Sequence, residues 1–84
     1  MFFVYLLKSK TDKSLYIGST NDLKRRLTEH NQGLSKYTNR KIPLELIYCE
    51  VYKSKKDALI RERKLKGFKN SYTELKKRLK FSLN

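Results

Sequence analysis

Several residue types are scarce in this 84-residue sequence, and each scarcity excludes a class of protein. The single cysteine, Cys49, excludes an internal disulfide framework, and the lack of Cys/His clusters excludes a zinc finger. No apolar run approaches the roughly 20 residues that span a bilayer. Residues 1–7 lack the basic segment and cleavage site of a secretion signal, so they are interpreted as a strand. We expect one domain over residues 1–84, in a soluble protein of a reducing compartment, the cytoplasm.

Acidic residues are also few, because 8 Asp and Glu stand against 21 Lys and Arg, a net charge of +13. Residues 53–84 hold 12 basic and 3 acidic residues, net +9, whereas residues 1–52 hold 9 and 5, net +4. Such a chain attracts polyanions, of which nucleic acid is the commonest in a cell. A solvated lysine surface and an anionic membrane are the alternatives. For a charge this large we favour nucleic-acid contact.

The first half of the sequence predicts a β-hairpin followed by a helix. Residues 2–8 and 15–19 are rich in β-branched and aromatic residues, and the polar segment 9–14 separates them. Asn21 is a suitable N-cap for the helix, and Gly33 is a suitable C-cap.

The second half predicts a strand and two helices. Pro43 precedes a strand over residues 44–52. Ser54 can cap a helix that runs to Lys66, and the capping box at residues 71–74 begins a third helix. The order ββαβαα predicts an α+β domain with a small three-stranded antiparallel sheet flanked by helices.

The second predicted helix carries an acid within its apolar arc. With Ala58 at zero and about 100° per residue, Leu59 lies at about 100°, Leu65 at about 340° and Glu62 at about 40°. A carboxylate at that position needs a cation, a metal or a proton. An ordinary ion pair with Lys or Arg is the simplest interpretation, and a metal site is the functional one.

The first predicted helix places a guanidinium beside its apolar residues. With Leu23 at zero, Leu27 lies at about 40°, Arg26 at about 300° and His30 at about 340°, whereas Arg25, at about 200°, points away. Arg26 could extend along the edge of the core. Alternatively, its planar fork could bind a phosphate.

The register of the hairpin decides whether two tyrosines share a face. If the loop is residues 10–13, Tyr5 pairs with Gly18 and lies diagonal to Tyr16. Gly18 would then leave space for a ligand, and the two phenols could hold a water or a phosphate oxygen. A loop one residue longer would put the tyrosines on opposite faces. Ordinary packing of strand tyrosines is the simpler interpretation.

Two tripeptides mark the strands of this hairpin, Phe3-Val4-Tyr5 and Tyr16-Ile17-Gly18. They resemble the Gly-Ile-Tyr and Tyr-Ile-Gly motifs of the GIY-YIG nuclease superfamily, most closely its small stand-alone bacterial members. Phe3 replaces the first glycine and Val4 the isoleucine, whereas Tyr5 is kept.

Other segments extend the resemblance over residues 3–79. Arg26 stands at the position of the functional arginine of the family, ten residues beyond the second tyrosine. His30 matches a histidine often found on that helix. Residues 36–38 and 46–50 resemble the loop and third strand of the small members, and residues 58–67 resemble the segment with the metal-binding glutamate, here Glu62.

The resemblance implies hydrolysis of a DNA phosphodiester bond with one divalent cation, Mg²⁺ or Mn²⁺, held by Glu62. Arg26 would neutralise the charge that builds on the phosphoryl oxygens. Tyr5 or Tyr16 would position or deprotonate the attacking water. His30 is the alternative proton carrier, because an unperturbed histidine titrates near pH 6.5.

The expected partner is DNA, branched or single-stranded, with a protein partner as a source of specificity and no membrane. A catalytically idle nucleic-acid-binding module, or a subunit that a partner directs to RNA or ribosomes, is the alternative. The expected phosphate contacts do not read sequence and involve Lys24, Arg25, Lys36, Tyr37, Arg40, Lys41, Arg63 and Lys66.

Overall fold

The computed structural model describes residues 1–84 and has three strands and three helices. In chain order they are β1 (Phe2–Ser9), β2 (Leu15–Thr20), α1 (Leu23–Asn31), β3 (Leu44–Tyr52), α2 (Lys55–Gly67) and α3 (Lys69–Arg78). The predicted order ββαβαα and the α+β class are confirmed. No helix has the length and apolar character that crossing a membrane requires.

The sheet has the strand order β2-β1-β3, and both neighbouring pairs are antiparallel. Tyr5 pairs with Gly18 and Leu7 with Tyr16, which is the register that the loop at residues 10–13 predicts. β1 is the central strand, and its residues 4–7 are all buried. β2 lies at an edge of the sheet, so one side of this strand is free of backbone pairing.

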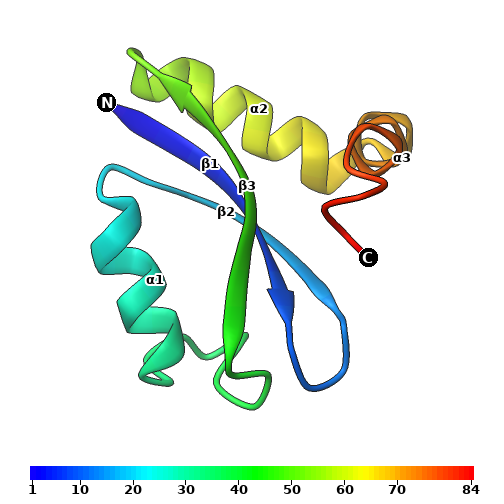
Figure 1. Ribbon diagram of the computed structural model, residues 1–84. Coiled ribbons are helices and arrows are strands. Elements are labelled where there is room, and N and C mark those ends of the chain that lie inside the picture. The colour runs from blue at the N-terminus through cyan, green and yellow to red at the C-terminus, as the bar shows by residue number, and fades with distance from the viewer.

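Helices cover both faces of the sheet, with α1 on one side and α2 and α3 on the other (Figure 1). The alternation of side chains along β1 supplies both cores, because successive residues of a strand point to opposite faces. Tyr5 and Leu7 pack with Leu44 and with partly buried leucines of α1. On the other face, Val4 packs with residues of α2 and α3, namely Ala58, Leu65 and Leu75.

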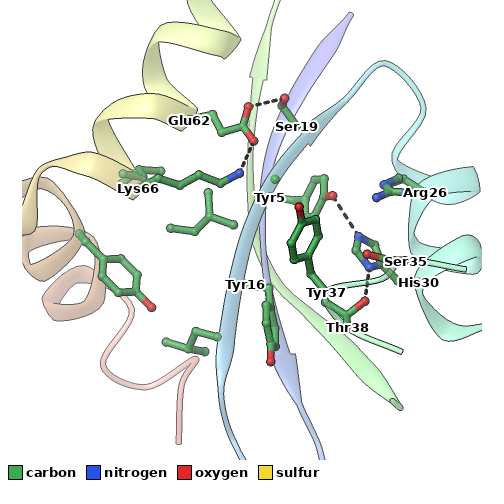
Figure 2. A pocket seen from close by; sticks show the side chains of 15 residues that line it. Tyr5, Tyr16, Ser19, Arg26, His30, Ser35, Tyr37, Thr38, Glu62 and Lys66 are labelled. Atoms are coloured by element: carbon green, nitrogen blue, oxygen red, sulfur yellow. Dashed lines mark hydrogen bonds and ion pairs between the residues drawn. The ribbon is translucent and has the colours of Figure 1, made fainter. Parts of the chain in front are cut away.

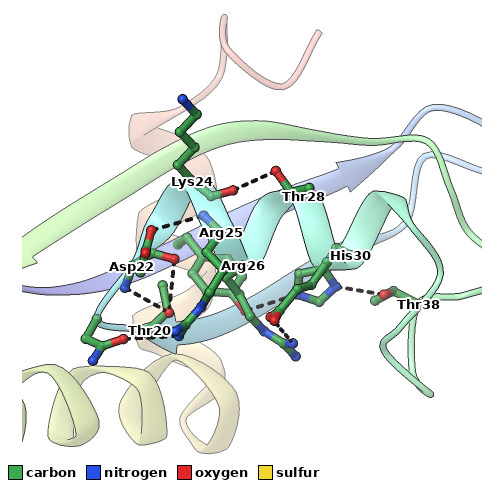
Figure 3. Close-up of polar contacts among 11 residues, drawn as sticks. Thr20, Asp22, Lys24, Arg25, Arg26, Thr28, His30 and Thr38 are labelled. Carbon is green, nitrogen blue, oxygen red and sulfur yellow. Dashed lines mark hydrogen bonds and ion pairs between the residues drawn. The ribbon is translucent and has the colours of Figure 1, made fainter.

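Two predicted helix starts are wrong. The N-cap of α1 is Asp22 rather than Asn21, because the Asp22 carboxylate accepts the Arg25 backbone N–H at 3.0 Å (Figure 3). The third helix begins two residues before its predicted cap, Ser71. Its N-cap is Phe68, which also ends α2 and has extended backbone at φ −119°, so the short break occurs there and Ser71 lies inside the helix.

Candidate active site

A cleft of about 670 Å³ lies along the edge strand β2 and is lined by side chains from both helical layers. Because β2 has no neighbour on this side, groups from α1 and from α2 approach each other past its edge. The five predicted catalytic residues all line this cleft, namely Tyr5, Tyr16, Arg26, His30 and Glu62 (Figure 2). The structure therefore brings these five residues to one cleft, and their individual roles stay predictions.

Tyr5 and His30 form a buried pair on the α1 side of the cleft. The Tyr5 hydroxyl lies 3.1 Å from His30 Nε2, and each residue is only 5% exposed. The other ring nitrogen of His30, Nδ1, lies 2.8 Å from the Thr38 hydroxyl. Burial and the Arg26 charge lower the pKa of His30 below its ordinary value. A neutral imidazole therefore faces Tyr5, and such a ring can accept a proton.

Gly18 does not leave the open space that the sequence suggested. A β-carbon at this position would overlap the hydroxyl and ring of Tyr5, so the phenol itself fills the space beside the glycine. The expectation of a ligand gap at Gly18 is wrong for this reason. Glycine is instead required here because the Tyr5 ring crosses closely over the backbone of β2.

Arg26 extends from α1 into the cleft. Its guanidinium pairs with Glu29 at 3.2 Å, and both side chains are 34% exposed. The Tyr5 hydroxyl and Glu29 beside it raise the pKa of Arg26, so the side chain stays cationic. Partly exposed pairs of this kind contribute little to stability, and the guanidinium can exchange Glu29 for a phosphate.

Glu62 reaches the same cleft from α2, on the other side of β2. Its carboxylate accepts hydrogen bonds from the Ser19 hydroxyl at 2.7 Å and from Lys66 Nζ at 2.8 Å. The Glu62 side chain is 17% exposed and that of Lys66 54%. The simple ion pair that the sequence allowed is therefore present, but it lies inside the cleft. The ammonium end of the pair is exposed to solvent, which weakens the pair, so another cation can compete with Lys66 for the carboxylate.

Glu62 is the one carboxylate among the residues that line the cleft. No group of three or more His, Cys, Asp or Glu side chains is positioned to hold a metal. Such a donor set does not suit a cation that needs a full shell of protein ligands, such as structural zinc. It fits a hard divalent cation that keeps several waters and binds one or two carboxylates together with substrate phosphates. The partly exposed carboxylate of Glu62 and the neighbouring Ser19 hydroxyl both offer oxygen donors, the kind that such a cation prefers.

Tyr16 lines the cleft but points away from the other groups. In Figure 2 its ring extends away from Arg26 and Glu62, and its hydroxyl accepts a hydrogen bond from Ser14 at 3.1 Å. Of the two tyrosines, Tyr5 is therefore the better placed to act with Arg26 and His30.

The predicted DNA contacts divide into four groups. Tyr37 and Lys66 line the cleft. Arg25 lines an adjoining cleft of about 390 Å³ that shares Ser19 and Arg26 with the first. Lys41 is paired with Asp12, whose pKa this pair lowers, so this lysine is less free to bind phosphate. The remaining four are exposed outside both clefts, namely Lys24, Lys36, Arg40 and Arg63.

Four lining residues with polar side chains were not predicted as site residues from the sequence, namely Ser19, Ser35, Thr38 and Tyr72. Ser19 directly follows the Tyr-Ile-Gly tripeptide, so its position was the available signal. Tyr72 lies on α3, where burial raises the pKa of its hydroxyl, and the residue also lines the cleft.

These features place the candidate site at the edge of a small antiparallel sheet. Residues 1–80 match the family described as the GIY-YIG catalytic domain, and the chain belongs to this family. It is 42% identical to UPF0213 proteins of Streptococcus pyogenes serotypes M5 (strain Manfredo) and M1, over 83% of this chain and 82% of each relative. The solution NMR structure of the UPF0213 protein from Bacillus halodurans is 34% identical, with a TM-score of 0.58, covering 95% of this chain and 86% of that chain.

Proposed function

We propose that this protein hydrolyses phosphodiester bonds of DNA with the help of a divalent cation, Mg²⁺ or Mn²⁺. The observation that carries the proposal is the convergence of four side chains from three elements on one cleft, namely Tyr5, Arg26, His30 and Glu62. Binding of phosphate alone would not call for a carboxylate in a cleft of such a basic protein. Membership of a catalytic-domain family supports the same conclusion.

In this proposal, Tyr5 and His30 accept the proton of the attacking water. The attacking water gives a proton to the Tyr5 oxygen as Tyr5 passes its phenolic proton to His30 Nε2, which lies 3.1 Å away. The neutral state of His30 favours this direction, because a protonated ring has no free lone pair. The water oxygen then forms a bond to phosphorus, the bond between phosphorus and the 3′ oxygen breaks, and the 3′ oxygen leaves.

Arg26 and Glu62 would stabilise the negative charge that develops on the phosphate and on the departing 3′ oxygen. The guanidinium of Arg26 donates to the phosphoryl oxygens, where negative charge increases in the transition state. A divalent cation held by Glu62 and by water would polarise the phosphate and stabilise the departing 3′ oxygen. Lys66, which pairs with Glu62, would turn to the phosphate backbone.

The adjoining cleft offers a continuation for the nucleic-acid strand. Its lining includes Arg25 and Lys55 as cations, and no salt bridge occupies either of them. A strand whose scissile phosphate contacts Arg26 would place a neighbouring phosphate there. Such contacts depend on salt and carry no sequence information.

The test separates cleavage from binding. Purified protein with Mg²⁺ or Mn²⁺ is expected to nick supercoiled, branched or single-stranded DNA. Glu62→Gln and Arg26→Ala should lower the rate by at least about 100-fold, the scale of losing one charge-stabilising group. Glu74→Gln is the matched control, because Glu74 forms a similar pair with Lys77 at an exposed site outside the cleft.

Two outcomes would contradict the proposal. Wild-type protein that binds DNA but cleaves none of the three forms under either metal would favour an idle binding module. Cleavage that is unchanged in Glu62→Gln would remove this carboxylate from the reaction.

A further inference from the structure

The loop between α1 and β3 carries two buried hydroxyl residues, Ser35 and Thr38, in a basic and otherwise mostly exposed segment. Lys36, Tyr37 and Arg40 are exposed, whereas Thr38 is only 2% exposed. Two backbone hydrogen bonds hold Thr38, since its N–H donates to the Ser35 carbonyl at 3.3 Å and its carbonyl accepts from Lys41 at 2.9 Å. A polar side chain is buried at a cost unless it has a partner.

The partner of this hydroxyl is the ring of His30. Thr38 Oγ1 lies 2.8 Å from Nδ1, and Figures 2 and 3 show the two side chains facing each other across the end of α1. Nε2 of the same ring faces the Tyr5 hydroxyl at 3.1 Å. Tyr5, His30 and Thr38 thus form a continuous chain of hydrogen bonds from β1 to the loop.

The charge of Arg26 gives this chain a direction. A neutral imidazole donates from one nitrogen and accepts at the other, and a guanidinium only donates. Tyr5 and Arg26 line the same cleft, and a cation beside a phenol favours the orientation in which the oxygen lone pairs face the guanidinium. In that orientation the phenolic proton points to His30 Nε2, and Nδ1 carries the ring proton and donates it to Thr38.

We propose that Thr38 is a positioning residue: its hydroxyl accepts the Nδ1–H of His30 and so holds the tautomer whose Nε2 can receive the phenolic proton of Tyr5. The tautomer itself is independent of any activity. The catalytic consequence rests on the proposed function. The same logic applies wherever a third group orients a base, since the hydrogen bond at one ring nitrogen decides the state of the other.

The charged and polar groups around the ring support a neutral His30. Arg26 and Glu29 come from α1 itself, Tyr5 comes from β1 and Thr38 from the loop. Burial and Arg26 lower the pKa of His30, and Glu29 opposes them. At neutral pH the question is therefore which nitrogen holds the single proton.

NMR can answer it without ambiguity, because His30 is the only histidine in the chain. Long-range ¹H–¹⁵N correlation spectra of the wild type above pH 7 should show Nδ1 protonated and Nε2 unprotonated. Thr38→Ser keeps the hydroxyl and should keep this pattern. Thr38→Val removes the hydroxyl with little change of shape, and should produce a mixture of tautomers or the Nε2–H form. The matched control is Thr28→Val, because the Thr28 hydroxyl bonds only the Lys24 carbonyl of the same helix at 2.9 Å.

Cleavage kinetics provide the second readout. Thr38→Val should lower kcat by about 10–100-fold, the scale for losing a group that orients a functional histidine, and Thr38→Ser should restore most of the rate. The acid limb of the pH–rate profile should move in Thr38→Val, whereas a merely structural loss would lower the rate equally at every pH.

The results separate this inference from the proposed function. The role of Thr38 is overturned if the wild type shows the Nε2–H tautomer. It is also overturned if the spectrum of Thr38→Val is identical to that of the wild type. Both results hold whether or not the protein cleaves DNA. The wild-type spectrum alone decides the tautomer if Thr38→Val does not fold. A correct tautomer in a protein that cleaves nothing would instead overturn the proposed function and leave the role of Thr38 at the ring intact.

Discussion

The phenol of Tyr5 lies directly across the backbone of Gly18, its partner in the antiparallel pair of β1 and β2. This close approach lets the ring, carried by the central strand, reach past the edge strand to His30 and the cleft. A side chain at position 18 would stand between them. The glycine of the Tyr-Ile-Gly tripeptide is therefore required for a steric reason. It leaves room for the Tyr5 ring at the site, and it is not needed to form a turn.

Gly18→Ala tests this relationship. The new methyl group must overlap the Tyr5 hydroxyl, so the ring moves and its hydrogen bond to His30 breaks. We expect cleavage to fall by at least about tenfold and the free energy of unfolding to fall by about 1–3 kcal/mol from overpacking. Cleavage assays and chemical denaturation measure the two effects.

Gly67→Ala is the control for that substitution. Gly67 ends α2, and no atom lies within 4 Å of where its β-carbon would be. Alanine there should leave cleavage unchanged and raise the free energy of unfolding by up to about 1 kcal/mol. Equal cleavage by Gly18→Ala and the wild type would contradict the assigned role of Gly18.

Local patterns predicted much of the architecture because they act over a few residues. The four-residue loop determined the hairpin register, which put Tyr5 opposite Gly18. The four-residue spacing of Arg26 and His30 predicted a shared helix face, and both line the cleft. The helical position of Glu62 inside an apolar arc also had a structural cause, since its half-buried carboxylate needs Ser19 and Lys66.

The errors occurred where contacts between distant segments decide the outcome. Sequence periodicity cannot show that the Tyr5 ring fills the space at Gly18, because that depends on the path of the side chain. Thr38 lies eight residues from His30, and only the fold of the loop makes them partners. The capping box at Ser71 was overridden because α2 and α3 are separated by Phe68 alone.

The proposed metal site at Glu62 predicts that Lys66 competes with the metal ion for this carboxylate, and the competition is measurable. Lys66→Ala removes the ammonium group that now lies 2.8 Å from the carboxylate. Apparent Mn²⁺ affinity, measured by calorimetry, should increase about twofold, in line with the small worth of such a pair. The salt dependence of DNA binding should weaken by about one unit of slope, because one phosphate contact is lost.

Lys77→Ala, at the exposed pair with Glu74, is the control and should change the Mn²⁺ affinity little. Unchanged Mn²⁺ binding by Lys66→Ala would argue against Glu62 as the ligand.

The lowered pKa of His30 predicts a dependence of stability on pH. Burial and Arg26 favour the neutral ring in the folded state, so the unfolded chain binds more protons when the pH falls below the ordinary value of 6.5. The contribution of His30 is present above that value and is lost as the pH falls through the folded pKa. Urea denaturation between pH 7.5 and about pH 5 should show this loss in the wild type. His30→Gln, which cannot titrate, should show a flatter profile over that range. Parallel profiles would mean that the pKa of His30 is not lowered.

A second acid, Glu50 of β3, links α2 to the sheet through Arg61. Its carboxylate accepts hydrogen bonds from Arg61 Nε at 2.9 Å and from the hydroxyls of Tyr48 and Tyr52 at 2.7 and 2.6 Å. Burial opposes the charge, but Arg61 and the two tyrosines outweigh it and lower the pKa of Glu50. Arg61 directly precedes Glu62, so this network also helps to fix the position of the proposed metal ligand.

Arg61→Met should therefore destabilise the protein without removing any group from the cleft. The substitution keeps much of the length of the side chain but leaves Glu50 without its cation, which should lower the free energy of unfolding by about 1–2 kcal/mol. Chemical denaturation measures the loss, and a double-mutant cycle with Glu50→Gln should recover a coupling energy of similar size. Arg63→Met, at an exposed position of the same helix, should change stability by less than about 0.5 kcal/mol. If Arg61→Met and Arg63→Met were equally stable, the half-buried pair would not anchor α2, and packing of Ala58 and Leu65 alone would hold the helix in place.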